Sequence, residues 1–110
     1  MRNLQTRDVF AFCRLVNEIG IKDELKEVCR KAENITDAFE GGYELLFGIF
    51  DKATGTKGEK ALIKFFADIF EEDEQAVAES DPVDFLDKVM QVAEPAKWLA
   101  FFNRAAALGQ

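Results

Sequence analysis

Hydrophobic residues recur every three or four positions in each long segment of the chain, which is the spacing of one face of an α-helix. No segment keeps the strict alternation of polar and apolar residues that a half-buried strand shows. Thr6, Thr36 and Asp81-Pro82 are suited to begin helices, and Gly20 is suited to end one. Helices are expected over residues 7–19, 22–33, 37–50, 59–71 and 82–93 and from Pro95 onward, with a shorter one near 74–78.

The spacing predicts an all-α protein, with one compact domain over residues 1–110 made of about five or six helices in an irregular orthogonal bundle. Its third helix contains Gly41-Gly42, which costs about 2 kcal/mol in a helix interior relative to alanine. This pair is expected to interrupt the helix or to mark a close helix crossing. The residues expected to share one core are Phe12, Val16, Leu25, Phe47, Leu62, Phe66 and Leu86.

Two phenylalanine doublets stand out, because adjacent residues on a helix point about 100° apart. Both rings of a doublet enter the core only where the helix is buried on two sides. Otherwise one ring of each pair is exposed and available to a partner or for self-association. The candidate apolar partner-binding residues are Phe65, Phe66, Trp98, Phe101 and Phe102.

The net charge of −7 lies entirely in the last part of the chain, since residues 65–110 carry three basic and ten acidic side chains. Nucleic-acid binding requires a basic face, so the composition argues against it and favours a basic protein partner. The acidic side chains either form a solvated surface or a docking face that speeds encounter with such a partner. The candidate acidic partner-binding residues are Glu71, Glu72, Asp73, Glu74, Asp84 and Asp87.

Candidate chemistry is scarce, because the chain has no histidine, which is the commonest general base and a frequent zinc ligand. Cys13 and Cys29 cannot complete a zinc site alone, and they are expected to be free thiols rather than a disulfide. The segment after Asp51 lacks most ligands of a calcium loop, including the final glutamate. We therefore expect no enzyme activity, no metal and no cofactor. No apolar run has the length of a membrane span.

The order of several stretches resembles the tail assembly chaperones of long-tailed bacteriophages. These stretches are Thr6-Arg7-Asp8, the segment from Asn17 to Leu25, Gly41-Gly42-Tyr43-Glu44-Leu45-Leu46, Phe65-Phe66-Ala67-Asp68-Ile69, Asp84-Phe85-Leu86 and the closing run from Trp98 to Phe102. The likeness spans nearly the whole chain but includes no catalytic signature.

This resemblance implies a small helical chaperone in the host bacterial cytoplasm that is absent from the mature virion. Such a protein binds the aggregation-prone tape measure protein and recruits tail tube subunits. It also implies weak self-association, in an open helical arrangement along the client. Two other functions are open: a regulatory protein that sequesters a basic or nucleic-acid-binding partner, and a structural head–tail connector subunit.

Overall fold

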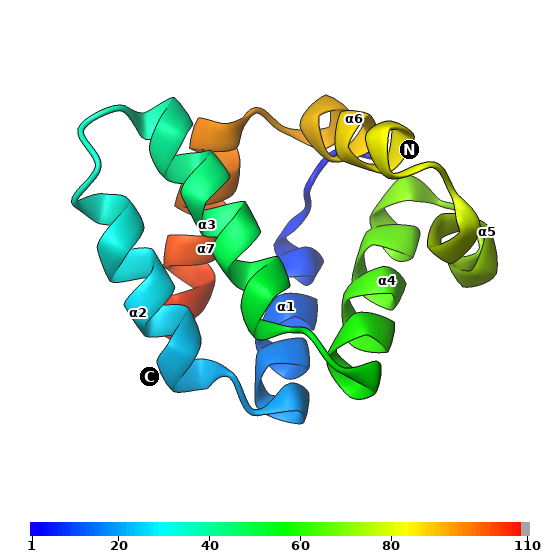
Figure 1. Cartoon of the computed structure of the whole chain (residues 1–110), viewed down its shortest axis with the longest axis horizontal. Coiled ribbons are helices and arrows are strands. Elements are labelled where there is room, and N and C mark those ends of the chain that lie inside the picture. The colour runs from blue at the N-terminus through cyan, green and yellow to red at the C-terminus, as the bar shows by residue number, and fades with distance from the viewer. Residues whose placement is uncertain (109–110) are drawn as a thin grey trace.

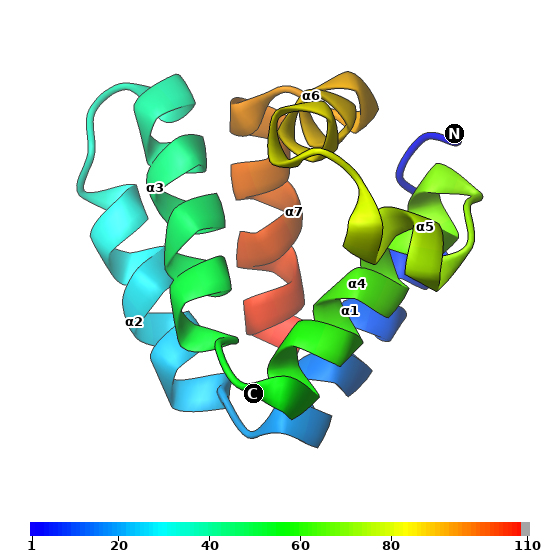
Figure 2. The same cartoon turned by 45° about the vertical axis from the view of Figure 1, so that its right-hand side comes forward.

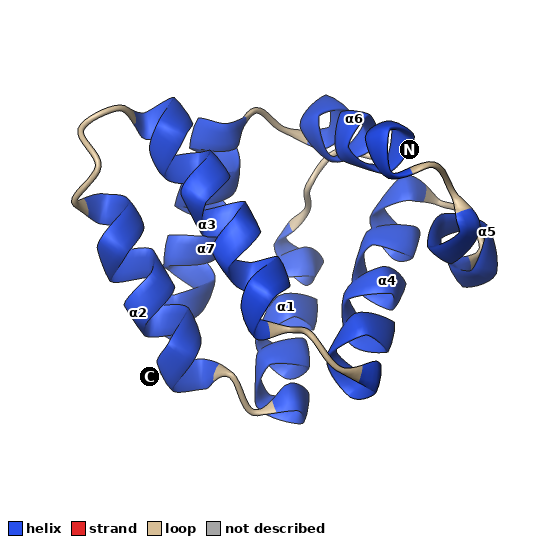
Figure 3. Cartoon of the chain, viewed as in Figure 1, coloured by secondary structure: helices blue, strands red, loops and turns tan. Residues whose placement is uncertain are grey.

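The structure is a computed structural model that describes residues 1–108, apart from the side chains of Thr56 and Leu108. The described residues form seven helices and no strand (Figure 3). The all-α prediction is confirmed, but the number of helices is seven rather than five or six; the seventh is the short helix expected near residues 74–78, which forms a separate element. The helices are α1 (Thr6–Ile19), α2 (Lys22–Glu33), α3 (Ala38–Lys52), α4 (Thr56–Phe70), α5 (Glu74–Glu79), α6 (Pro82–Val92) and α7 (Pro95–Leu108).

The helices form two packed groups that share α7. On one side α2, α3 and α7 lie next to one another, and on the other side α1 packs against α4 and α7 (Figures 1 and 2). Helix α6 crosses the top of the molecule in both views, and α5 covers only part of α4. Because α6 packs mainly against α4, the side of α3 that faces α6 is left partly open.

Local sequence explains most of the helix ends. Gly20 ends α1 with a φ of 72°, a left-handed conformation that glycine adopts without steric cost. Asp81 accepts hydrogen bonds from the backbone N–H groups of Val83 and Asp84, and Pro82 is the first residue of α6. The predicted bounds of α2, 22–33, agree with the structure, whereas α4 begins three residues before its predicted start at residue 59.

The glycine pair of α3 lies where this helix crosses α7. The helix continues through Gly41 and Gly42 without a break, so the predicted interruption is wrong and the predicted close crossing is confirmed. A Cβ atom on Gly42 would collide with the carbonyl oxygen of Pro95, whereas one on Gly41 would lie 3.1 Å from the carbonyl oxygen of Ala32. Glycine at residue 42 therefore sets how closely α3 approaches the start of α7.

Aromatic rings around Trp98 form the centre of the core. The ring of Trp98 stacks on Phe102 with centroids 5.4 Å apart, and it meets Phe66 at 5.9 Å. Its indole N–H donates a 3.0 Å hydrogen bond to the carbonyl of Val89, which ties α7 to α6. The polar end of the largest side chain is thus satisfied inside an apolar core.

Five of the seven predicted core residues are buried, and the other two are corrections. Phe12, Val16, Leu25, Leu62 and Phe66 lie in one cluster. Phe47 and Leu86 are instead 55% and 40% exposed. Both have helical spacing that matches a buried face, but they face the open side between α3 and α6, where no further helix of the described chain covers them.

An ion-pair cluster holds the N-terminal segment against α1 and α4. The Arg2 guanidinium donates two hydrogen bonds to the carboxylate of Asp8, at 2.7 and 2.8 Å, and a third to Asp68 at 2.7 Å. Burial by itself raises the pKa of Asp8, but the hydrogen bonds from Arg2 and the Gln5 N–H, together with the Arg2 charge, outweigh it and lower that pKa. Asp8 is therefore ionised in the folded protein at neutral pH.

Gly42→Ala should lower the free energy of unfolding by about 2–3 kcal/mol, because the added methyl group forces α3 away from Pro95. Gly41→Ala is the matched control and should have a much smaller effect, since its methyl group needs only a small adjustment. Urea denaturation followed by circular dichroism measures both. Equal effects of the two substitutions would contradict this account of the crossing.

Asp8→Asn should destabilise the protein by about 3 kcal/mol at neutral pH, because it leaves the nearly buried Arg2 without its main partner. The pKa of Asp8 is lower in the folded than in the unfolded state, where it is about 3.9. Its contribution is therefore fully present above that value and is lost as the pH falls through the folded-state pKa. Urea unfolding at several pH values should show the difference between the two proteins shrinking toward acid.

Candidate protein-binding groove

An aromatic row lies along the outer face of α3, formed by Phe39, Tyr43 and Phe47 at intervals of four residues. The ring of Tyr43 lies 5.1 Å from that of Phe39 and 6.1 Å from that of Phe47, between centroids. Phe39 and Phe47 are 51% and 55% exposed, so the row presents apolar area to solvent. Contiguous exposed rings of this kind are typical of protein-binding surfaces.

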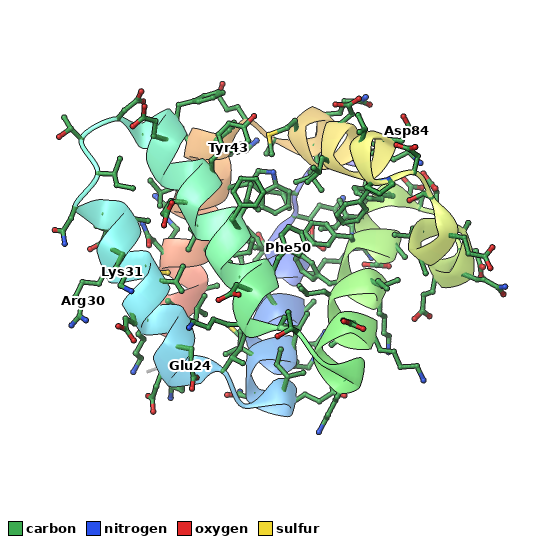
Figure 4. All side chains as sticks on the ribbon, viewed as in Figure 1. Glu24, Arg30, Lys31, Tyr43, Phe50 and Asp84 are labelled. Carbon is green, nitrogen blue, oxygen red and sulfur yellow. The ribbon has the colours of Figure 1, made fainter. Side chains whose placement is uncertain are left out.

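Beside this row an apolar groove of about 520 Å³ opens between α3, α4, α5 and α6. Phe50 lies at the α4 side of α3 (Figure 4) and forms part of its wall, with its ring 5.9 Å from that of Phe66 and 6.0 Å from that of Phe85. The apolar residues that line the groove are Phe47, Phe50, Ala53, Leu62, Ile63, Phe66, Val77, Ala78, Pro82, Phe85 and Leu86.

The groove continues along α3 as a second depression of about 150 Å³ between α3 and α6. Phe47, Phe50 and Leu86 line both, so the two form one elongated surface. Tyr43 and Met90 line its far end. An elongated apolar groove that is open to solvent suits a helical peptide better than a small polar ligand, which needs converging polar groups.

The charged residues that line the groove are acidic. Among the residues that line its two parts, the charged side chains are Glu59 and Asp87, and no lysine or arginine is included. Asp84 lies on the outer side of α6 (Figure 4) and adds a further negative charge near Val83, which is 65% exposed. A partner with apolar anchors and basic flanking residues is therefore complementary to this surface.

The structure buries the five predicted apolar partner-binding residues. Phe65, Phe66, Trp98, Phe101 and Phe102 are all buried, so the alternative in which one ring of each doublet is exposed is wrong. Phe66 alone reaches the groove, as part of its floor. Both rings of each doublet are buried because the helices that carry them are covered on two sides. Helix α7 packs against α1, α2 and α3, and α4 packs against α1 on one side and against aromatic rings of the core on the other.

The structure separates the predicted acidic residues into two places. Asp84 and Asp87 lie on α6, with Asp87 at the groove, whereas Glu71, Glu72, Asp73 and Glu74 lie at the turn from α4 to α5. Some of the latter have structural partners: Glu72 accepts a 2.6 Å hydrogen bond from Lys88 of α6, and Asp73 caps α5. A docking role for these acidic residues stays a prediction.

Sequence reasoning missed the aromatic row because it assigned α3 a single apolar face. In the structure Leu45 and Ile49 point into the core, while Phe39, Tyr43 and Phe47 lie on another side of the same helix. The sequence signal that could have revealed this row is that apolar residues occur on nearly all sides of the helix. Such a helix is either completely buried or has a second contact surface.

Both cysteines are free, as the sequence predicts. The Cys13 thiol donates to the Ala105 carbonyl at 3.4 Å, and burial, with the nearby charge of Glu33, raises the pKa of Cys29 to about 11. Cys29 is therefore protonated at neutral pH and is a poor nucleophile. Within residues 1–108 no cluster of three or more potential ligands is placed to hold a metal ion, and no helix is both long and apolar enough to span a bilayer.

Comparisons with known proteins find no family model, no curated protein and no solved structure that matches this chain. The resemblance to tail assembly chaperones therefore stays a prediction.

Phe47→Ala should lower the free energy of unfolding by less than about 1 kcal/mol, because more than half of this side chain is already in water. Phe66→Ala is the contrast and should cost about 3–5 kcal/mol, since its ring is buried among other rings. Chemical denaturation of both variants tests the assignment of surface and core. A loss at residue 47 as large as that at residue 66 would contradict the open groove.

Proposed function

We propose that the protein is a tail assembly chaperone that holds an apolar helical segment of the tape measure protein in the groove beside α3. The observation that carries this proposal is the open apolar groove with its row of exposed rings and its acidic surroundings. The resemblance in sequence supplies the name of the client. Recruitment of tail tube subunits, action in the host cytoplasm and absence from the mature virion belong to the same proposal.

The shape of the groove supports a helix as the bound segment. An amphipathic helix places side chains at intervals of three and four residues in a line, and it binds by inserting that line into an apolar groove. The elongated surface along α3 offers successive positions for such side chains, from Tyr43 past Phe47 to Leu62. Exposed backbone edges for pairing with a strand are not formed by the described residues, which are helical or in short loops.

The chemistry of the surface fits a chaperone that delays aggregation rather than an enzyme. Rings and aliphatic side chains bind apolar client surface through burial, which is tolerant of sequence. The charge of −7 on the chain favours solubility of the complex. A long aggregation-prone client requires both properties.

Phe47→Ala and Leu86→Ala should each speed dissociation of a tape measure fragment about 10- to 100-fold, which corresponds to the loss of about 1.5–3 kcal/mol of apolar burial. Phe10→Ala is the matched control, because Phe10 is also 55% exposed but lies on α1 outside the groove. Surface plasmon resonance with overlapping fragments of the tape measure protein from the same genome gives both rate constants.

Asp84→Asn with Asp87→Asn should slow association at low salt and change little at about 0.5 M salt, because exposed charges act mainly on encounter. Loss of binding in the Phe10 variant, with none in the Phe47 and Leu86 variants, would move the client site away from the groove. If no tape measure fragment binds, the proposed function is contradicted and a regulatory or connector protein is favoured.

A further inference from the structure

A second surface, separate from the apolar groove, carries charges of both signs in a defined order. A depression of about 740 Å³ runs between α1 and α4, which lie side by side (Figures 1 and 2). Lys57, Lys60 and Lys64 occupy one end of its α4 wall, and Asp68 and Glu72 occupy the other. We call these five residues the charged stripe.

The order of charges along the stripe is not explained by the stability of α4. The positive end of a helix dipole is its N-terminus, which favours acidic side chains, and the C-terminus favours basic ones. The first turn of α4 carries both Lys57 and Glu59, Lys60 follows, and the last turn carries Asp68 and no basic residue. The dipole accounts for Glu59 but not for the two lysines or for Asp68, and residues that local stability does not account for are typical of functional surface.

The lysines of the stripe also lack partners within the described part of the chain. The ion pairs among residues 1–108 include none made by Lys57, Lys60 or Lys64, and Arg14 on the facing wall makes none either. At the acidic end Lys88 pairs with Glu72, and Arg2 uses one carboxylate oxygen of Asp68, whose side chain is still 64% exposed. The lysines at one end and Asp68 at the other therefore retain charge for a partner.

The spacing of the stripe makes it complementary to itself. Lys64 and Asp68 each lie two residues from the level of Phe66 along α4, with Lys57 and Lys60 toward one end and Glu72, just after the helix, beyond the other. A second copy turned by a two-fold axis at that level runs antiparallel, so Lys64 of each copy lies opposite Asp68 of the other, and the lysine end of each copy faces the acidic end of the other. A parallel copy would set lysine against lysine.

We propose that the charged stripe on α4 is a salt-sensitive contact between two copies of this chain, packed antiparallel about a two-fold axis. Small side chains, Ala11 and Ala61, lie in the same depression and permit close approach of the two helices. The pair is closed, because both copies use the same stripe. It differs in this respect from the open chain of copies that the resemblance implies, and it leaves the apolar groove on α3 free for a client.

A nucleic acid is the competing occupant of the four basic side chains. The acidic half of the stripe lies in the same depression and repels a phosphate backbone, which favours a partner that carries both signs. A second copy of this chain has both signs in the required order.

The test is the mass in solution, measured by sedimentation equilibrium over a concentration series at about 20 mM and about 500 mM salt. The mass should rise toward that of two chains at low salt, stop there, and fall toward one chain at high salt. The variant with Lys57→Glu, Lys60→Glu and Lys64→Glu should dissociate at least about tenfold more readily. The matched control reverses three exposed charges elsewhere, Arg30→Glu, Lys97→Glu and Arg104→Glu, and should behave as the unaltered protein.

A charge-swapped mixture makes the test specific. Glu74 lines the acidic end of the same depression. Glu72→Lys with Glu74→Lys should also weaken the pair, and mixing this variant with the triple lysine variant should restore a two-chain species. Circular dichroism shows whether each variant is folded. A monomer under all conditions, growth beyond two chains, or salt-sensitive binding of duplex DNA by the monomer would overturn the proposal. Client binding by the lysine variant should be unchanged, so the two proposals fail separately.

Discussion

The burial of Trp98 among rings from neighbouring helices determines how the other parts of this protein are arranged. Its ring packs on Phe66 and Phe102, and its N–H is satisfied by the backbone of α6. Because so much of the chain's aromatic area is used at this point, α4 and α7 are buried on more than one side. Seven short helices then have no remaining element to cover the outer side of α3.

Helix α3 consequently has two functions on two faces. One face carries the glycine pair and aliphatic side chains and forms part of the core, while the other presents the aromatic row. The chain contains eleven phenylalanines, and the role of each depends on where it lies in the fold. The residue type that stabilises the fold around Trp98 is, at residue 47, more than half exposed beside the groove.

Much of the fold is predictable from the sequence, because helical periodicity and helix caps are local properties. The bounds of α2 and the start of α6 at Asp81-Pro82 agree with the structure for this reason. The candidate site is less predictable. Periodicity shows that Phe47 lies on an apolar face and that Phe101 and Phe102 lie on adjacent faces, but not which neighbouring helix covers each face. That depends on the position of α7 at the centre, which is a property of the whole chain.

The close crossing at Gly42 has a consequence for the shape of the groove. Helix α3 is held against the start of α7 by direct backbone approach, which leaves it no room to shift. Helix α6, on the opposite side, packs against α4 and is held through side chains: the Trp98 hydrogen bond to the Val89 carbonyl, the ring of Phe85 and the Lys88–Glu72 ion pair. The groove thus has one wall fixed by backbone contact and one wall held through side chains. Under the proposed function, α6 is the wall that would adjust to bound helices of different diameter, while the aromatic row would keep its position.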